Sequence, residues 1–146
     1  MKIQRLTDYA IRTLGYLYSH PCSVSTAQNI AESLGITYQV YLKISNMLKK
    51  GGLIRSVRGR CGGYALAKPG EEISLHDIIL VMEGPLVINR CLEADGYCSG
   101  KFSLTCPVHC YLEQVQNFLV DGLSSTTIAE IWKDYSFEAK AKIEPS

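Results

Sequence analysis

Residues 91–110 hold the side chains with the greatest capacity for chemistry in this 146-residue chain. They read CLEADGYCSGKFSLTCPVHC and contain four of the six cysteines together with His109. Thiolates and imidazoles bind metals or take part in redox reactions, and in a reducing compartment clustered cysteines do so more often than they form structural disulfides. The stretch is therefore predicted to bind a metal or to act in redox chemistry.

The N-terminal residues favour a reducing compartment. Charges at Lys2, Arg5, Asp8 and Arg12 interrupt them, so they lack the continuous apolar segment of a signal peptide. No stretch approaches the ~18 apolar residues that a membrane span needs. We expect a cytoplasmic protein with no membrane partner, in which disulfide scaffolding is the weaker interpretation of the cysteines.

The cysteine spacing argues against two familiar kinds of site. Zinc sites typically contain paired C-x2-C knuckles, and the nearest approach to such a pair is Cys106-x3-Cys110. A radical enzyme with a C-x3-C-x2-C motif would need a further cysteine where Glu113 stands. The chain is accordingly not expected to be an enzyme.

The charges divide the chain into halves of opposite sign. Residues 1–70 carry ten Lys/Arg against Asp8 and Glu32, a net +8, whereas residues 71–146 carry five against twelve Asp/Glu, a net −7. This asymmetry indicates that only the first half meets a polyanion. A chance difference between two solvated surfaces is the alternative.

The basic half contains the pattern of three helices. The first opens at Thr7 and ends at His20-Pro21, the second is AQNIAESL followed by Gly35, and the third is YQVYLKISNMLKK followed by a double glycine. Two helices joined by a short turn containing glycine are typical of a helix-turn-helix. The third helix would then be the recognition helix, with these residues facing outward: Tyr38, Gln39, Tyr41, Lys43 and Asn46.

The segment that follows, LIRSVRGRCGGYALAKPG, predicts two strands joined by a glycine-rich turn. The turn carries Arg58 and Arg60. After a helix-turn-helix, such a hairpin is a wing that can reach phosphates or the minor groove. The sequence therefore predicts binding to double-stranded DNA through Tyr38, Gln39, Tyr41, Lys43, Arg55, Arg58 and Arg60.

The acidic half predicts a linking helix, a loop and a long helix. SLHDIILVMEG forms the first, and VHCYLEQVQNFLVDGL has apolar residues near the spacing of a helix-helix seam, which either packs on its own domain or makes a dimer. A short helix containing Ile128, Ile131 and Trp132 is expected to cover that seam. The fold class is mainly α: a winged helix-turn-helix DNA-binding domain with a two-stranded wing and a long C-terminal dimerisation helix. The expected divisions are a DNA-binding domain with its linking helix at 1–84, a cysteine-bearing loop at 85–107, the dimerisation and short helices at 108–135, and a tail at 136–146.

The chain resembles the winged-helix regulators that include the iron-sulfur cluster assembly regulator IscR and the nitric-oxide-sensing repressor NsrR. The resemblance runs from about Lys2 to Tyr135 and lies in LTDYAIRTLGYL, YLKISNMLKKGGLIRSVRG, GGYALAKP, ISLHDIILVMEG and three cysteines with six and seven residues between them. It implies a homodimer that binds palindromic promoter DNA and carries one iron-sulfur cluster per subunit.

The resemblance implies three cluster ligands and leaves the fourth open. The three are Cys91, Cys98 and Cys106. His109 has the offset of the histidine ligand of a [2Fe-2S] cluster in the assembly-regulator type, whereas Asp8 corresponds to the partner-subunit aspartate that can complete a [4Fe-4S] cluster in the nitric-oxide-sensing type. Cys110 is a third candidate. We favour His109 and a [2Fe-2S] cluster.

The predicted function is transcription regulation that senses iron-sulfur cluster status through a bound cluster, which modulates promoter binding. The alternatives are a nitric-oxide- or redox-sensing repressor of the same family, and a thiol- or zinc-based DNA-binding regulator. Of the two remaining cysteines, Cys22 is expected to be a small, partly buried residue without a role. Cys61 is expected to be a turn residue of the wing, with a thiol sensor as the alternative.

Overall fold

The computed structural model describes residues 2–21, 24–60, 62–101 and 105–137. The predictions for Cys22 and Cys61, and for most of the tail at 136–146, lie outside these residues.

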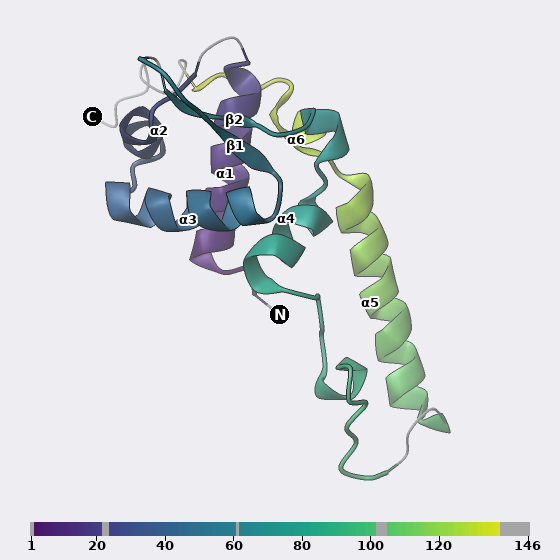
Figure 1. The fold of residues 1–146 in the computed structure, drawn as a ribbon. Helices are drawn as coiled ribbons and strands as arrows, with labels where there is room; N and C mark the ends of the chain where they lie inside the picture. The colour runs from purple at the N-terminus through teal and green to yellow at the C-terminus, as the bar shows by residue number, and fades with distance from the viewer. Residues whose placement is uncertain (1, 22–23, 61, 102–104, 138–146) are drawn as a thin grey trace, which may run out of the picture.

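The chain forms a body and an arm (Figure 1). The body consists of residues 2–83 and 126–137, and the arm consists of residues 84–125, which leave the body as an extended segment and return along a long helix. The helices and strands are α1 (Arg5–Ser19), α2 (Ala27–Leu34), α3 (Tyr38–Lys50), β1 (Ile54–Val57), β2 (Gly63–Leu66), α4 (Leu75–Glu83), α5 (Pro107–Ser125) and α6 (Ile128–Trp132), with short 3-10 turns η1 (Gly70–Glu72) and η2 (Arg90–Leu92). The predicted mainly α, winged-helix fold is confirmed.

The first helix is capped by a residue from another helix. α1 begins at Arg5, and the N–H of Gln4 at its N-cap donates to Oε1 of Glu83 at 2.8 Å. The hydroxyl of Thr7 lies inside the helix and donates to the same oxygen. The prediction that Thr7 caps this helix is wrong, because Glu83 of α4 supplies the acceptor that the first turn needs.

The helix-turn-helix forms as predicted. Thr26 and Thr37 cap α2 and α3, their hydroxyls accepting from the N–H groups of Asn29 at 3.2 Å and Val40 at 3.3 Å. Gly35 ends α2 with φ of 67°, a left-handed conformation that glycine adopts without steric cost. The turn therefore places α3 across the body as the exposed second helix of the motif (Figure 1).

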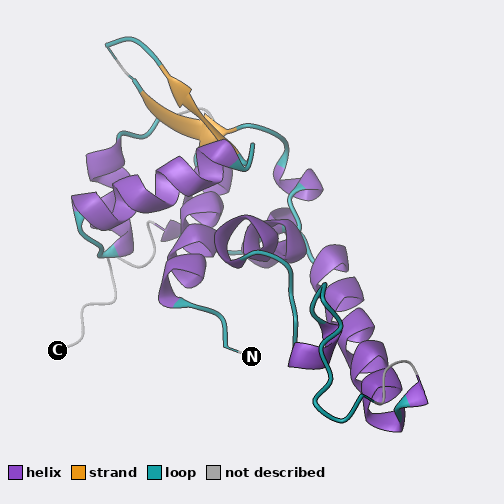
Figure 2. Cartoon of the chain, turned by 60° about the horizontal axis from the view of Figure 1, so that its bottom comes forward, coloured by secondary structure: helices purple, strands orange, loops and turns teal. Residues whose placement is uncertain are grey.

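The wing is a two-stranded antiparallel hairpin that projects from the helices (Figure 2). Ile54 pairs with Leu66, and the register runs to Val57 opposite Gly63. The start of β2 is fixed to the chain before α2, since the N–H of Tyr64 donates to the carbonyl of Ser25 at 3.0 Å. A Cβ at Gly63 would lie 2.2 Å from that carbonyl oxygen, so only glycine permits this approach.

The core lies between α1, α3, α4 and the short helix α6. Its fully buried side chains include Leu14, Ile44, Leu48, Ile78 and Ile128. α6 packs against α1 and η1, with the ring of Trp132 lying so close to α1 that a Cβ at Gly15 would come within 2.2 Å of it. The prediction that this helix covers the apolar seam of α5 is wrong, because Ile128 and Trp132 complete the core of the body instead.

The arm leaves the body at the end of α4 and re-enters it beside the start of the same helix. Ser74 caps α4 through a capping box with Asp77, and Ser74 also forms an antiparallel bridge with Thr127. The N–H of Leu75 donates to the carbonyl of Thr126 at 2.9 Å. Among the described residues, none of the helices combines the length and apolar character that crossing a bilayer requires.

Candidate functional site

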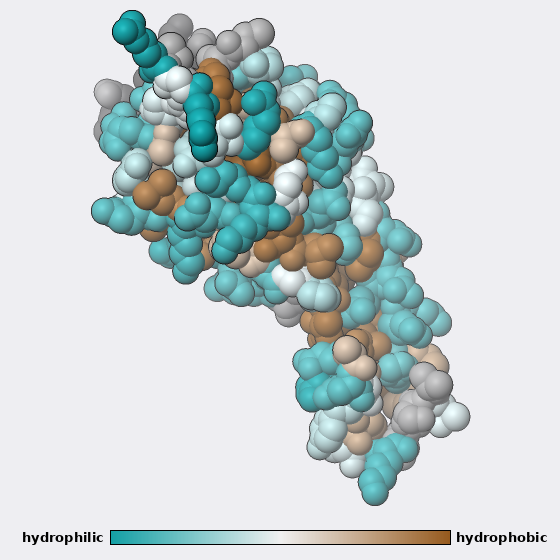
Figure 3. All heavy atoms as spheres, viewed as in Figure 1, coloured by the Kyte–Doolittle hydropathy of each residue, from teal (hydrophilic) through white to brown (hydrophobic). Residues whose placement is uncertain are grey.

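The recognition helix and the wing present a polar, basic face. On α3, Tyr38, Gln39, Lys43 and Asn46 are exposed, as predicted. Hydrophilic side chains gather over the wing on the same side of the molecule (Figure 3). The three predicted wing residues are exposed as well: Arg55, Arg58 and Arg60.

Tyr41 is a correction to this set. Its side chain is fully buried, and its ring packs edge-on against Tyr64 with centroids 5.4 Å apart. Helical spacing explains the error, since Tyr41 shares the inward face with Ile44 and Leu48. Burial, followed by the charge of Tyr64, raises the pKa of Tyr41 far above its ordinary value. The prediction that Tyr41 contacts DNA is wrong.

A basic residue was missed beside the wing. The ammonium group of Lys49, in the last turn of α3, lies 5.8 Å from the centre of the Tyr64 ring on β2. This cation–π contact places a positive charge where the recognition helix meets the wing. The paired lysines at the end of the predicted third helix were the available signal.

The cysteine-bearing loop forms a pocket of about 440 Å³ between η2 and the start of α5. It brings together the three cysteines and the histidine that the sequence singled out: Cys91, Cys98, Cys106 and His109. All four are half-buried. Cys106 is the N-cap of α5 and His109 lies in its first turn, whereas Cys91 lies in η2 and Cys98 in the loop.

The donor set consists of three thiols and one imidazole. Within the described ranges, no three His, Cys, Asp or Glu side chains lie close enough to hold a single metal ion. The four side chains are nevertheless of the types that bind the iron atoms of an iron-sulfur cluster. Three cysteines and one histidine are also a zinc donor set, so the donor types alone fit both groups.

The other two fourth-ligand candidates do not line this pocket. Asp8 lies on α1 in the body, where its carboxylate accepts from Nε of Arg12 at 3.0 Å. Cys110 is exposed on α5, one turn after Cys106. Within one subunit the structure thus groups His109, and neither Asp8 nor Cys110, with the three cysteines.

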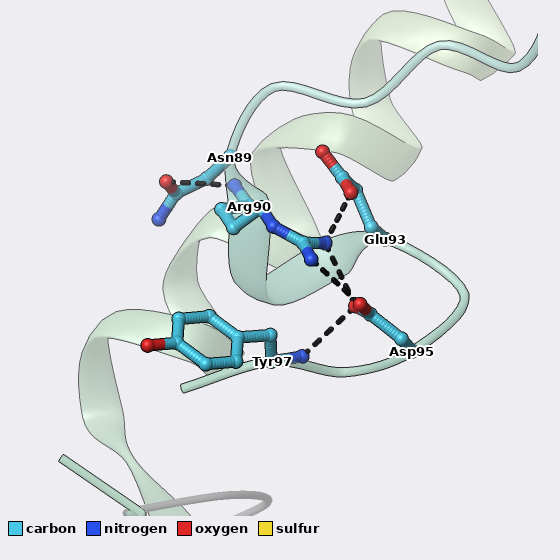
Figure 4. Close-up of polar contacts among 5 residues, drawn as sticks. All are labelled: Asn89, Arg90, Glu93, Asp95 and Tyr97. Atoms are coloured by element: carbon cyan, nitrogen blue, oxygen red, sulfur yellow. Dashed lines mark hydrogen bonds and ion pairs between the residues drawn. The ribbon is translucent and has the colours of Figure 1, made fainter. Parts of the chain in front are cut away.

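A polar network borders the pocket (Figure 4). Arg90 donates to both oxygens of Asp95 at 2.7 and 2.6 Å, and it also donates to Glu93. Oδ1 of Asp95 accepts the N–H of Tyr97 at 3.2 Å, and the guanidinium carbon of Arg90 lies 5.3 Å from the centre of the Tyr97 ring. The bonds from Arg90, followed by the one from Tyr97, hold the pKa of Asp95 below its usual range. The sequence analysis assigned no role to these residues.

A further polar contact reaches a candidate ligand directly. Nδ2 of Asn89 donates to Sγ of Cys91 at 3.4 Å, while Oδ1 of Asn89 accepts the N–H of Arg90 at 2.9 Å. These two bonds tie the sulfur of Cys91 to the backbone at Arg90 through one side chain.

α5 has two apolar faces. On one face, Leu119 and Leu123 line a groove of about 170 Å³ with α4 and the 84–87 segment, and hydrophobic side chains are visible along this junction (Figure 3). On the other face, Tyr111 and Phe118 lie two turns apart and are exposed to 66% and 78%. Leu119 and Leu123 of the predicted seam thus make an intramolecular contact, and the exposed aromatic residues lie outside that seam.

Comparison with known proteins gave consistent matches along nearly the whole chain. The sequence model of the Rrf2 family, described as iron-dependent transcriptional regulators, matches residues 3–134. Protein aau3 of Rhizobium meliloti (strain 1021) is 30% identical over 130 residues, which are 84% of each chain. The structure of T. potens IscR is similar with a TM-score of 0.71 and 28% identity, covering 100% of this chain and 94% of that one. The oxidised form of Staphylococcus aureus CymR is similar with a TM-score of 0.69 and 28% identity, covering 93% and 98%.

Proposed function

Because the chain belongs to the Rrf2 family of transcriptional regulators, we propose that it binds promoter DNA under the control of an iron-sulfur cluster in the arm. The observation that carries this proposal is the convergence of Cys91, Cys98, Cys106 and His109 on one pocket. The similarity to T. potens IscR, which spans the whole chain, supports the same proposal.

The pocket residues would each have a defined role. The three cysteines would bind iron as thiolates, and His109 would bind through a neutral ring nitrogen, completing a [2Fe-2S] site. When bound, the cluster would supply sensitivity to oxidation and to iron supply. Asn89 would donate to the sulfur of Cys91 and hold it in the pocket.

DNA would be bound by α3 and the wing. Arg58 and Arg60 would reach phosphates from the wing tip, and Gln39 and Lys43 would face base edges from the recognition helix. A cationic Lys49 beside Tyr64 would add to the attraction for the phosphate backbone.

α4 is the element through which the arm would affect DNA binding. It packs against α1, α3 and α5. Its Val81 lies so close to the end of α3 that a Cβ at Gly51 would come within 2.4 Å of it, and its Glu83 caps α1. Close packing of this kind transmits small displacements, so a change in the arm would move the recognition helix.

The open face of α5 would join two subunits. Tyr111 and Phe118 are large aromatic side chains exposed on the same side of α5, where a second apolar surface could cover them. Pairing of two such faces would produce a homodimer, and two recognition helices related by a two-fold axis would read a palindromic site.

A thiol-based regulator is the second candidate function. It is favoured by the similarity to Staphylococcus aureus CymR, a structure determined in an oxidised form. Such a regulator would respond to oxidation through its cysteines without iron.

Anaerobic purification of the full chain distinguishes the two candidates. We expect iron and acid-labile sulfide in the protein, visible absorption that disappears on chelation, and a promoter affinity that differs between cluster-loaded and cluster-free protein. Protein without iron or sulfide whose DNA binding responds to oxidants alone would instead establish the thiol-based function.

A further inference from the structure

The two walls of the pocket are held in place by different means. Cys106 and His109 are fixed by the first turn of α5, where Pro107 occupies the first helical position. Cys91 and Cys98 have no such scaffold, since only the three-residue turn η2 and an irregular loop carry them. If nothing else ordered this loop, it would lose much conformational entropy when its two cysteines bound a cluster.

One carboxylate joins the two ends of this loop. Asp95 accepts two hydrogen bonds from Arg90, which immediately precedes Cys91, and one from the N–H of Tyr97, which immediately precedes Cys98. Gly96, between Asp95 and Tyr97, has φ of 57°, a left-handed conformation that glycine adopts without steric cost. The same contacts therefore reach the neighbour of each cysteine.

We propose that Asp95 and Arg90 act as positioning residues that hold Cys91 and Cys98 on a shared wall of the cluster pocket. This inference rests on the proposed function, because it assigns a purpose to contacts beside the proposed ligands. We call Arg90 and Asp95 the loop clamp. Glu93 supports it by accepting from Arg90, and Tyr97 supports it by donating its N–H to Asp95.

The geometry distinguishes the loop clamp from an ordinary surface ion pair. Isolated exposed pairs contribute little, because water screens them and side-chain entropy opposes them. The clamp is a two-pronged Arg–carboxylate contact with a second carboxylate on the same guanidinium and an aromatic ring facing it. Its side chains remain about half exposed, so they add little to the core of the body, and their effect falls on the loop.

The experiment measures how fast a ferrous chelator removes iron from the anaerobically loaded full chain. Asp95→Ala and Arg90→Gln each open the clamp, and we expect about tenfold faster extraction, a size typical of residues that orient metal ligands. Arg90→Lys keeps the charge but not the fork and should fall between these variants and wild type. Glu113→Gln is the matched control, since it removes an exposed carboxylate of α5 that takes no part in the clamp, and it should stay within about twofold of wild type.

Two further measurements show whether the clamp orders the loop or stabilises the whole fold. The thermal unfolding temperature of the cluster-free full chain should be the same in all variants, while amide exchange at Tyr97 should accelerate in Arg90→Gln. Extraction from Asp95→Ala and Arg90→Gln at the wild-type rate would overturn the loop clamp alone. Failure of the wild-type protein to take up iron would overturn the proposed function itself, at any measured rate of amide exchange at Tyr97.

Discussion

The body and the arm are stabilised in opposite ways. The body has fully buried aliphatic side chains from each of its four longer helices, and all four of those helices are capped by side-chain hydrogen bonds within or between helices. In the arm, no described residue of α5 is buried, and the loop is held by polar contacts between exposed side chains. A region without a core of its own depends on what it binds, which for the arm means the proposed cluster and the proposed second subunit.

The largest effect should come from removing a proposed ligand in the arm. Cys98→Ala is expected to abolish stable cluster binding, because the pocket then offers too few thiolates, while the body remains folded. Iron and sulfide content, measured beside thermal unfolding, checks this. Cys110→Ala, a cysteine outside the pocket, is the matched control and should retain the cluster. Normal iron content in the Cys98 variant would refute the ligand assignment.

A cavity in the body should destabilise the fold by about 3 kcal/mol. Ile44 is fully buried, and Ile44→Ala removes three of its carbons from a packed core. Denaturant unfolding measures the loss. Leu80→Ala, at a position 45% exposed, is the control and should cost less than about 1 kcal/mol. Equal losses in both variants would contradict the contrast between core and surface in the body.

A charge on the open face of α5 should weaken the proposed dimer by about 2 kcal/mol, because Phe118→Glu would place an unpaired carboxylate between two apolar surfaces. Sedimentation equilibrium of the full chain measures the dissociation constant. Asn117→Glu adds the same charge at the neighbouring exposed position and should leave association unchanged. Dimers of wild-type strength in the Phe118 variant would move the interface to another surface.

Removal of both wing-tip charges should weaken DNA binding about tenfold at low salt. In Arg58→Ala with Arg60→Ala, the slope of log affinity against log salt should fall by up to about two phosphate equivalents. Fluorescence anisotropy across a salt series provides both quantities. Lys133→Ala removes an exposed charge after α6 and is expected to change neither. An unaltered slope in the double variant would place the DNA contacts elsewhere.

The smallest expected effect is a gain of about 1 kcal/mol in Tyr41→Phe. The hydroxyl of Tyr41 is buried and has no hydrogen-bond partner among the described residues, so its removal relieves a desolvation cost. The raised pKa adds a pH dependence: above about pH 10 the unfolded chain releases this proton more readily than the folded one, so stability falls as pH rises. Unfolding curves from pH 8 to 11 should show a shallower decline in Tyr41→Phe than in the exposed control Tyr38→Phe.

The sequence predicted local features better than contacts between distant elements. Helix ends at Gly35 and at Gly51-Gly52, the wing and the long α5 were accessible because caps, breakers and alternation are local signals. Tyr41 was misplaced because an aromatic residue on a helix can face DNA or the core, and only packing against Tyr64 decides.

The distant contacts had no local signal. Glu83 reaches α1 from another helix, and α6 returns to α1 rather than to its sequence neighbour α5. In the pocket, the four donors were predicted from residue type and family resemblance, and their grouping agrees with that prediction. The loop clamp was missed because its charged residues read as ordinary solvated side chains.

The bridge between Ser74 and Thr127 has a topological consequence. Because the chain returns beside the point where α4 begins, the arm is a detour that starts at the C-terminal end of α4 and finishes beside its N-terminal end. Lengthening or shortening such a detour leaves its two attachment points in place. Changes in the arm, including changes to the chemistry proposed for its cysteines, would therefore leave the architecture of the DNA-binding body in place.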